Sequence, residues 1–286
     1  MKKIGLSTDC VCDLPESYFE KHEVSVVYFY VKTETGQFRD VYEVTAGNIT
    51  EYLSEQKKKI ETMPPEPEEF VEHFTQELKK YESIIHIAIS ANASHAYENA
   101  VRAVEMMGEE GKRVHIFDSM HVSTGMGHIV IKAEEMRNQG KDIAEILKEL
   151  DSFKRKVSTS FISPNADYLY YNGKVSKGVR NLCAWFHVHP VLKMKNGKIT
   201  LASIRVGKYH KAVLRYIRHQ LKHANKIDRK RLFITHTGCP VRFISRVKDE
   251  VVRNCSFESV IVTKASATIS GNCGVETIGV LFVNES

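Results

Sequence analysis

Apolar and polar residues follow one another along the first half of the chain in blocks that predict alternating strands and helices. Short apolar runs rich in β-branched residues indicate buried strands, and stretches with a 3.6-residue apolar period indicate helices. The predicted strands are residues 3–8, 24–31, 84–89 and 113–118. The predicted helices include residues 49–58, 68–81, 125–138 and 143–154. This alternation predicts a parallel sheet with helices on both faces.

The pattern changes near residue 157. Strands are predicted at 157–162, 188–194, 199–204, 232–237 and 259–264, with helices at 165–171, 207–225 and 242–254. Asn196-Gly197 predicts a tight hairpin, and residues 267–283 predict a glycine-rich loop before a last strand. We therefore expect an α/β protein of two domains. Residues 1–160 would form a parallel-sheet, three-layer domain, and residues 161–286 a mixed-sheet α/β domain.

Residues 84–100 join a buried strand to a helix through a turn rich in small and hydroxyl residues. In open α/β sheets such turns lie at the carboxyl ends of the strands, where ligands bind. Unpaired amides at the start of the helix would attract an anion, and a serine hydroxyl would add a donor. Ser94 is the leading candidate for a ligand contact. The alternative is that Ser90 or Ser94 only caps the helix.

Composition and charge restrict the class of protein. The chain of 286 residues has 42% hydrophobic residues and contains no run of about 20 apolar residues, so no membrane span is expected. We see no signal peptide, and the six scattered cysteines favour a cytoplasmic protein with reduced thiols. Residues 1–150 have 17 basic and 27 acidic residues (net −10), whereas residues 151–286 have 24 and 8 (net +16), which adds up to the total of +6.

The basic charge concentrates on one predicted helix. Its apolar face lies opposite a stripe of basic residues, namely Lys208, Lys211, Arg215, Arg218 and Lys222. The alternatives are a solvated outer face and a surface that docks an acidic partner or a membrane. Nucleic acid is not favoured, because no nucleic-acid-binding motif accompanies the charge.

Three short patterns suggest ligands. Cys10-x-Cys12 and His187-x-His189 have the spacing of metal ligands on a strand, but neither has a second pair at zinc spacing, so buried thiols and ordinary histidines are favoured. The run from Ser270 to Gly274 could cradle an anion with its amides, or form a tight turn. No phosphate loop, dinucleotide motif or nucleophile elbow is present.

Six segments, in order, resemble the DegV family of bacterial fatty-acid-binding proteins over essentially the whole chain. They are Thr-Asp-Cys-Val-Cys-Asp-Leu-Pro at 8–15, Thr-Met-Pro-Pro-Glu-Pro at 62–67, Ser-Ala-Asn-Ala-Ser-His-Ala-Tyr at 90–97, Asp118-Ser119, Asn-Gly-Lys-Val-Ser at 172–176 with Arg205, and the terminal glycine-rich segment. The resemblance implies a lipid tunnel between two domains, with a fatty acid as ligand and no cofactor or metal.

The resemblance also implies roles for individual residues. Thr62 and Ser94 would hold the carboxylate of a long-chain fatty acid, with His95, Ser270 and Asn272 nearby. The protein would be a carrier rather than an enzyme, presenting the carboxylate to an acidic kinase subunit. That subunit would dock on basic residues: Lys174, Arg205, Arg215 and Arg218.

Departures from the family pattern leave alternatives open. A family glycine is His95 here, a family histidine falls on Asn272, and Lys174 replaces an arginine linked to kinase docking. These changes affect phosphoryl transfer more than lipid binding, so a lipid carrier without a kinase partner is one alternative. A second is a small-molecule enzyme at the strand-end turns, with Asp9 and Asp118 as an acid–base pair.

Overall fold

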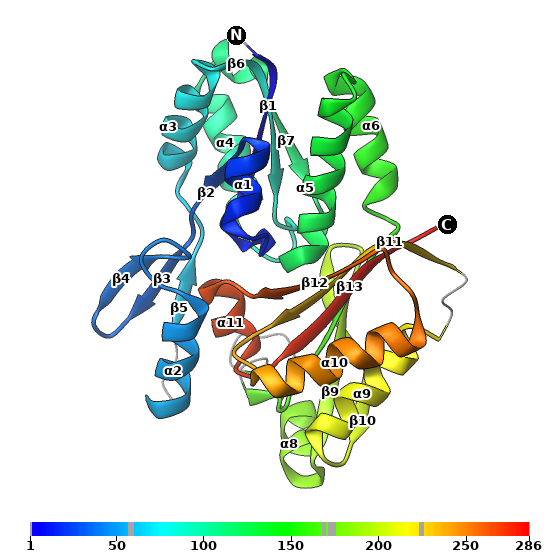
Figure 1. Cartoon of the computed structure of the whole chain (residues 1–286). Helices are drawn as coiled ribbons and strands as arrows, with labels where there is room; N and C mark the ends of the chain where they lie inside the picture. The colour runs from blue at the N-terminus through cyan, green and yellow to red at the C-terminus, as the bar shows by residue number, and fades with distance from the viewer. Residues whose placement is uncertain (1, 57–59, 168–169, 171–175, 223–225, 286) are drawn as a thin grey trace.

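The computed structural model describes residues 2–56, 60–167, 170, 176–222 and 226–285. Two sheets form the body of the molecule, one in each half of the chain, and a small third sheet projects beside the second (Figure 1). The predicted combination of a parallel sheet and a mixed sheet is confirmed.

The first sheet has the strand order β2-β1-β6-β7, and all its neighbours are parallel. Its strands are β1 (Lys2–Asp9), β2 (Val24–Val27), β6 (Tyr81–Ala88) and β7 (Val114–Asp118). The helices around it are η1 (Cys10–Cys12), α1 (Glu16–His22), α3 (Pro67–Leu78), α4 (Ala96–Met106), η2 (Glu110–Arg113), α5 (Ser123–Asn138) and α6 (Ile143–Phe153). Helices α3 and α4 pack together on one side of the sheet, and α5 and α6 on the other (Figure 1).

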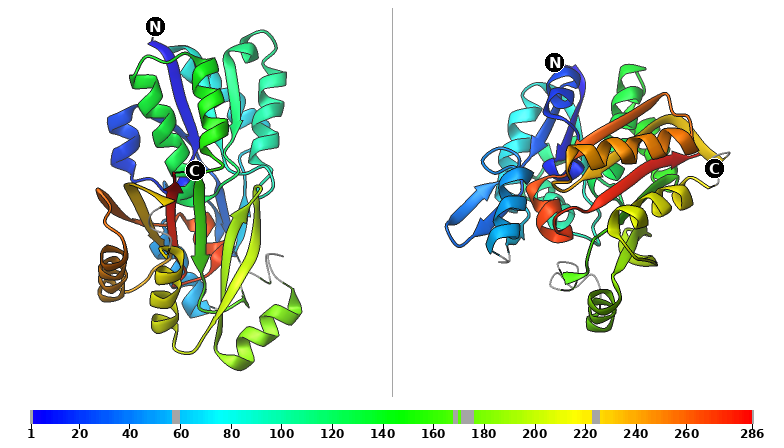
Figure 2. Two further views of the ribbon diagram at one scale, coloured as in Figure 1. Left: turned by 90° about the vertical axis from the view of Figure 1, so that its right-hand side faces the viewer. Right: turned by 60° about the horizontal axis from the view of Figure 1, so that its bottom comes forward.

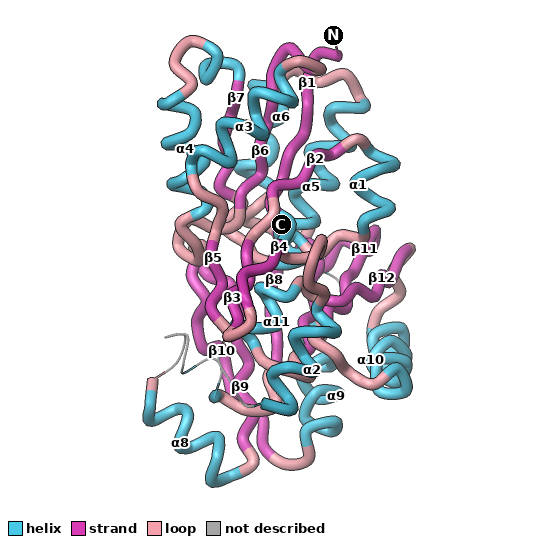
Figure 3. The backbone as a smooth tube through the Cα atoms, turned by 90° about the vertical axis from the view of Figure 1, so that its left-hand side faces the viewer, coloured by secondary structure: helices cyan, strands magenta, loops and turns pink. Residues whose placement is uncertain are grey.

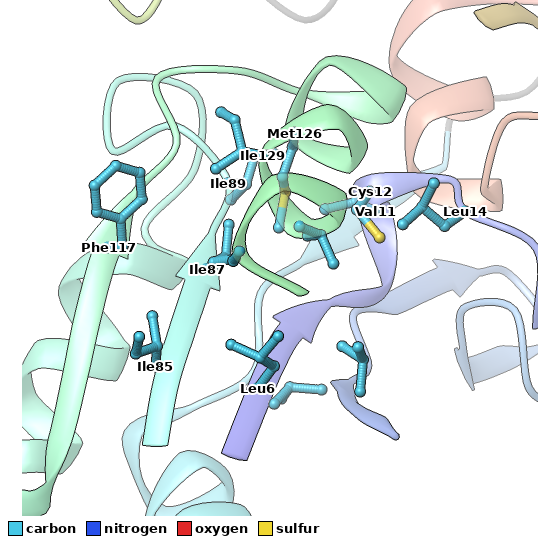
Figure 4. Packing of buried hydrophobic residues seen from close by; sticks show 14 of the residues in the cluster. Leu6, Val11, Cys12, Leu14, Ile85, Ile87, Ile89, Phe117, Met126 and Ile129 are labelled. Atoms are coloured by element: carbon cyan, nitrogen blue, oxygen red, sulfur yellow. The ribbon is translucent and has the colours of Figure 1, made fainter. Parts of the chain in front are cut away.

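The core of this half forms between the sheet and α5. Figure 4 shows Leu6, Ile85 and Ile87 of the strands and Met126 and Ile129 of α5, which belong to one buried apolar cluster. All five side chains are buried. Burying such a side chain contributes about 1.5–3 kcal/mol, so this layer fixes the strand ends that carry the turns.

The second sheet has the order β10-β9-β8-β13-β11-β12, and only its β11–β12 pair is parallel. Its strands are β8 (Val157–Ile162), β9 (Val188–Lys195), β10 (Lys198–Val206), β11 (Ile227–His236), β12 (Ser259–Lys264) and β13 (Ile278–Asn284). Helices α9 (Tyr209–Gln220) and α10 (Val241–Asn254) lie together across it, while α8 (Lys177–Phe186) extends from one end (Figure 2). The domain boundary proposed at residue 160 falls within β8.

One strand prediction is wrong, because part of the predicted strand belongs to the small third sheet, whose order is β4-β3-β5. Residues 24–31 were expected to form one strand, but β2 ends at Val27 and β3 (Tyr30–Thr33) pairs with β4 (Gly36–Arg39) and β5 (Glu61–Met63). The chain bends at the buried Phe29, so its two halves join different sheets. Helix α2 (Ala46–Gln56) follows β4. The small sheet and α2 form a subdomain that lies beside α11 (Ala267–Cys273; Figure 3).

Residues 267–273 form a helix, α11 (Ala267–Cys273), where the sequence predicted a glycine-rich loop. The helical amides bond within the helix, as from Ser270 to the carbonyl of Ser266, so the run does not cradle an anion. A Cβ on Gly271 would lie 2.1 Å from Cδ1 of Ile60. The glycine therefore permits close approach of α11 to the small subdomain.

Other local predictions have mixed outcomes. The hairpin is confirmed, because Asn196 and Gly197 have φ values of 50° and 76°. Helix α9 is shorter than predicted. The helix predicted over 165–171 falls partly on residues outside those described. Within the described ranges, no helix has the length and apolar character needed to cross a membrane.

Candidate functional site

A cavity of about 240 Å³ lies between the two sheets. Its walls come from the turn after β6, the start of α5, strands β8, β11 and β13, and helix α11. Most of its lining is apolar, including Phe29, Ile89, Phe161 and Leu281. The turns at the carboxyl ends of the parallel strands therefore face a pocket whose other walls come from the second half of the chain. This is the position where open α/β sheets bind ligands.

Four polar residues predicted from the sequence, Thr62, Ser94, His95 and Asn272, line this cavity. Two of them, Thr62 and Asn272, are in direct contact. The side-chain amide of Asn272 donates to Oγ1 of Thr62 at 3.0 Å and to the carbonyl of Thr268 at 2.9 Å. Helix α11 thus holds a residue from the end of the chain against one from β5.

The hydroxyls of Thr62 and Ser94 each have a hydrogen available to donate. Oγ1 of Thr62 accepts from Asn272, and Oγ of Ser94 accepts from the amide of Ala96 at 3.2 Å. Because each oxygen accepts its hydrogen bond from a protein donor, the hydrogen of each hydroxyl remains available to donate to a ligand. Ser94 therefore accepts from the first amide of α4, whose N-cap position is His95, and also lines the cavity. Two hydroxyl donors in the lining of a mainly apolar cavity suit an anionic group.

The amides of residues 89–94, in the turn before α4, all donate to protein acceptors. Of the amides at the start of the helix, where an anion was expected, that of Ala96 donates to Oγ of Ser94. The amide of Ile89 donates to Oδ2 of Asp9 at 2.8 Å, and that of Ala91 to Oδ1 of Asp118 at 3.2 Å. The amides of residues 90, 92, 93 and 94 also have protein acceptors. Asp9 and Asp118 therefore brace the turn, and neither is among the residues that line the cavity.

Hydroxyl side chains also line the deeper part of the cavity, and most of them bond to protein groups. Oγ1 of Thr277 donates to the carbonyl of Cys273 at 3.0 Å, and Oγ1 of Thr237 donates to that of Gly274 at 2.6 Å. Ser160 and Tyr216 share a hydrogen bond of 2.8 Å. Because these hydrogen bonds stay within the protein, the wall presents mainly carbon to a ligand.

Two buried carboxylates that the sequence analysis missed hold the start of α11. Oδ1 and Oδ2 of Asp40 accept from the amides of Ala267 and Thr268 at 2.8 and 2.7 Å. Oδ1 of Asp13 accepts from the amide of Ser266 at 2.8 Å, and its Oδ2 accepts from the hydroxyl of Ser123. Acidic residues near the amino end of a helix are stabilising. Here the amides at the start of α11 lie more than 220 positions from Asp13 and Asp40, so no local pattern reveals the contact.

Titration of Asp13 gives a testable consequence. Burial raises the pKa of this carboxyl to about 7, although hydrogen bonds from Ser123 and Ser266 oppose the shift. The unfolded chain loses this proton near pH 4, so between about pH 4 and pH 7 the folded state binds more protons. This group therefore makes the free energy of unfolding fall as the pH rises through that window.

We expect Asp13→Asn to flatten this dependence, because the amide has the same shape and does not titrate. Urea unfolding at about pH 5 and pH 7.5 measures the slope for both proteins. Equal slopes would contradict the assigned role. Burial also raises the pKa of Asp40, so part of the wild-type slope will persist in the variant.

The remaining predicted residues lie away from the cavity lining. Ser270 is buried in α11, and Arg215 donates to the carbonyl of Val206. Arg218 pairs with Glu250 of α10 at 2.6 Å, so the basic stripe is partly neutralised by an acid that the local sequence does not show. The side chain of Arg205, on β10, is half-buried, and Lys174 lies outside the described residues.

The two pairs with metal-ligand spacing serve other purposes. Cys10 and Cys12 are buried free thiols, and the amide of Phe29 donates to the sulfur of Cys10 at 3.3 Å. Both ring nitrogens of His189 lie 2.7 Å from backbone carbonyl oxygens. In the part of the chain that the structure covers, no group of three or more potential ligands surrounds a metal site.

A serine–histidine–aspartate arrangement that the sequence did not suggest lies inside the first half. Oγ of Ser7 lies 2.9 Å from Nδ1 of His86, whose Nε2 is 3.3 Å from Oδ1 of Asp9. His73 extends the chain through a 2.9 Å contact with Ser7. Ser7, His86 and Asp9 are each 0% exposed, so a substrate cannot reach them. This network braces the sheet.

Comparisons with protein families and with known sequences both match the DegV family. A family model described as an uncharacterised protein of the DegV family matches residues 3–285. A DegV domain-containing protein from Caldanaerobacter subterraneus is 25% identical over 284 residues, covering 99% of both chains.

Solved structures show the same fold. A DegV family protein from Thermus thermophilus, described for its fatty acid binding, superposes with a TM-score of 0.86 at 24% identity, over 99% of each chain. A DegV family protein from Eubacterium eligens, loaded with heptadecanoic acid, gives 0.85 at 21% identity, over 98% of this chain and 99% of the other.

Proposed function

The chain belongs to the DegV family, and on this basis we propose that it binds a long-chain fatty acid in the cavity between its two sheets. The carboxylate would accept hydrogen bonds from the hydroxyls of Thr62 and Ser94, and the acyl chain would occupy the apolar interior. The observation that carries the proposal is the pair of hydroxyls whose oxygens already accept from protein donors.

Two energetic terms make this site suitable for a fatty acid. A carboxylate moved out of water loses several kcal/mol of hydration unless it is hydrogen-bonded, and two hydroxyl donors offset that loss. The acyl chain gains about 0.8 kcal/mol for each methylene that it buries. Because the deep hydroxyls are bonded within the protein, they impose little penalty on a hydrocarbon.

The exposure of one lining residue supports a carrier role. His95 lines the cavity and has an exposed side chain, so a carboxylate bound near this residue would lie close to the surface. The structures from Thermus thermophilus and Eubacterium eligens support a fatty acid as the ligand. We infer that the protein presents the carboxylate to a second protein, with a fatty acid kinase as the candidate partner.

Native mass spectrometry of the protein purified from bacteria tests the ligand directly. We expect a co-purifying fatty acid, and rebinding of added fatty acid after delipidation. Ile199→Trp should displace it, because the indole enters the cavity that Ile199 lines. Excluding two methylenes costs about 1.6 kcal/mol, or roughly tenfold in affinity.

Ile204→Trp is the matched control. It places the same bulk on the same strand, at a side chain that is 39% exposed and does not line the cavity. It should keep the lipid. A wild-type protein that carries no fatty acid and binds none after its addition would overturn the proposal, and equal loss in both variants would mean that the ligand lies elsewhere.

A further inference from the structure

A glycine lies in the part of the cavity wall that the second sheet provides. Gly279 and Leu281 of β13 both line the cavity. Gly279 pairs with Phe161 of β8 on one side and with Thr235 of β11 on the other, and these two residues line the cavity as well. Between two larger side chains the wall therefore presents only backbone.

The backbone does not require a glycine at this position. The φ of Gly279 lies outside the left-handed region, so other residues can adopt the same conformation. An added Cβ would lie 3.0 Å from Cδ1 of Leu281, 3.4 Å from the carbonyl oxygen of Ser160 and 3.7 Å from Cβ of Phe161. The nearest of these atoms is the end of a flexible side chain, so a methyl group fits after a small shift. Glycine inside a strand is destabilising relative to alanine, and it often marks a place that a ligand approaches closely.

We propose that Gly279 sets the length of the acyl chain that the cavity accepts. This inference rests on the proposed function, because it identifies a residue that selects the ligand of the same site. The hydroxyls proposed for the carboxylate belong to β5 and to the turn before α4, whereas Gly279 and its paired residues belong to the second sheet. The hydrocarbon passes over Gly279 and fills the space that a side chain would otherwise take. A larger residue there would confine the protein to shorter acyl chains.

Binding of two saturated fatty acids of different length to delipidated full-length protein tests this role. The probes are heptadecanoic acid and dodecanoic acid, which is about five methylenes shorter, and each buried methylene contributes about fourfold to affinity. A methyl group displaces about one methylene and an isopropyl group about three, so we expect Gly279→Ala to weaken binding of heptadecanoic acid about fourfold and Gly279→Val about sixtyfold. Dodecanoic acid, whose chain leaves this space empty, should bind within about twofold of its wild-type affinity in both variants.

Three comparisons separate lost space from lost structure. The melting temperature of Gly279→Ala should not fall, because alanine reduces the conformational freedom of the unfolded chain. Gly279→Val combined with Leu281→Ala keeps the total number of side-chain carbons at the two positions, and it should recover about tenfold or more of the lost affinity for heptadecanoic acid. Val280→Ile adds one carbon on the opposite face of β13, in the buried cluster that includes residues of α9, and it should leave the ratio of the two affinities unchanged.

The two levels of the proposal fail differently. A wild-type protein that binds neither fatty acid would overturn the proposed function. Wild-type affinity for heptadecanoic acid in a folded Gly279→Val protein would overturn the role of Gly279 alone, and so would an equal loss of affinity for both fatty acids. A folded double variant that binds heptadecanoic acid no better than Gly279→Val would also contradict that role.

Discussion

Asp40→Ala is expected to lower the free energy of unfolding by about 2–6 kcal/mol, because two buried amides lose their acceptor and each unsatisfied donor costs about 1–3 kcal/mol. The amides are those of Ala267 and Thr268, and Asp40 is 0% exposed. Water cannot readily replace the carboxylate there. Urea unfolding monitored by circular dichroism measures the change, with the slope on denaturant checked for two-state behaviour.

Asp142→Ala is the matched control for this variant. Asp142 caps α6 by accepting from the amide of Glu145 at 2.8 Å, but it lies at the surface. Its loss should cost about 0.5–2 kcal/mol, the usual value for a helix cap. If Asp40→Ala costs no more than Asp142→Ala, the two carboxylate contacts to α11 are not stabilising. Asp40→Asn should lie between wild type and alanine, since its amide oxygen can still accept from one of the two donors.

The effect of Asp40 extends to the proposed ligand site. Helix α11 carries Asn272, whose amide fixes Thr62 through a 3.0 Å hydrogen bond. When the start of α11 is released, this contact has less support. We therefore expect Asp40→Ala to weaken fatty acid binding as well, although the residue does not line the cavity.

The second large effect concerns the two hydroxyls themselves. Thr62→Val and Ser94→Ala each remove one hydrogen bond to a charged group, worth about 1.5–3 kcal/mol, or roughly ten- to hundredfold in affinity. The double variant should lose more than either single variant. Binding of a fatty acid to delipidated protein gives the affinities, and unfolding curves show whether the fold persists, because Ser94→Ala also removes the hydrogen bond to Ala96.

Thr277→Val provides the comparison within the same cavity. Thr277 lines it, but its hydroxyl already donates to the carbonyl of Cys273. The substitution should reduce stability slightly and leave lipid affinity close to wild type. Unchanged affinity in the double variant would place the carboxylate away from Thr62 and Ser94. Equal losses at Thr62, Ser94 and Thr277 would indicate a general change in cavity shape.

Several features could be predicted from the sequence because their causes are local. The strand–turn–helix over residues 84–100 follows from an isoleucine-rich run, small turn residues and an amphipathic stretch, and the structure has β6, the turn and α4 in that order. The Asn196-Gly197 hairpin follows from the positive φ that both residues accept. The resemblance in six ordered segments indicated the family, which the match over residues 3–285 confirms.

Other features depended on contacts between distant residues. Residues 24–31 have one continuous strand pattern, yet the chain bends at Phe29 because its two halves pair with different sheets. Residues 267–273 contain two features that disfavour a helix, glycine and hydroxyl side chains. They are helical because Asp13 and Asp40 satisfy the first amides and Gly271 permits packing against Ile60.

The residue types of the site are local features of the sequence, whereas their arrangement in space depends on contacts between distant residues. The sequence by itself indicated Ser94 as a candidate ligand contact from the strand–turn–helix pattern around it, and Thr62 through the resemblance to the DegV family. Only the tertiary structure placed them in one cavity with Asn272 and His95, and showed that Asn272 occupies the acceptor of Thr62. It also paired Arg218 with Glu250 and used Asp9 and Asp118 to brace the turn. Hydrogen-bond partners across more than a hundred residues depend on how helices and sheets pack, and no local periodicity records that packing.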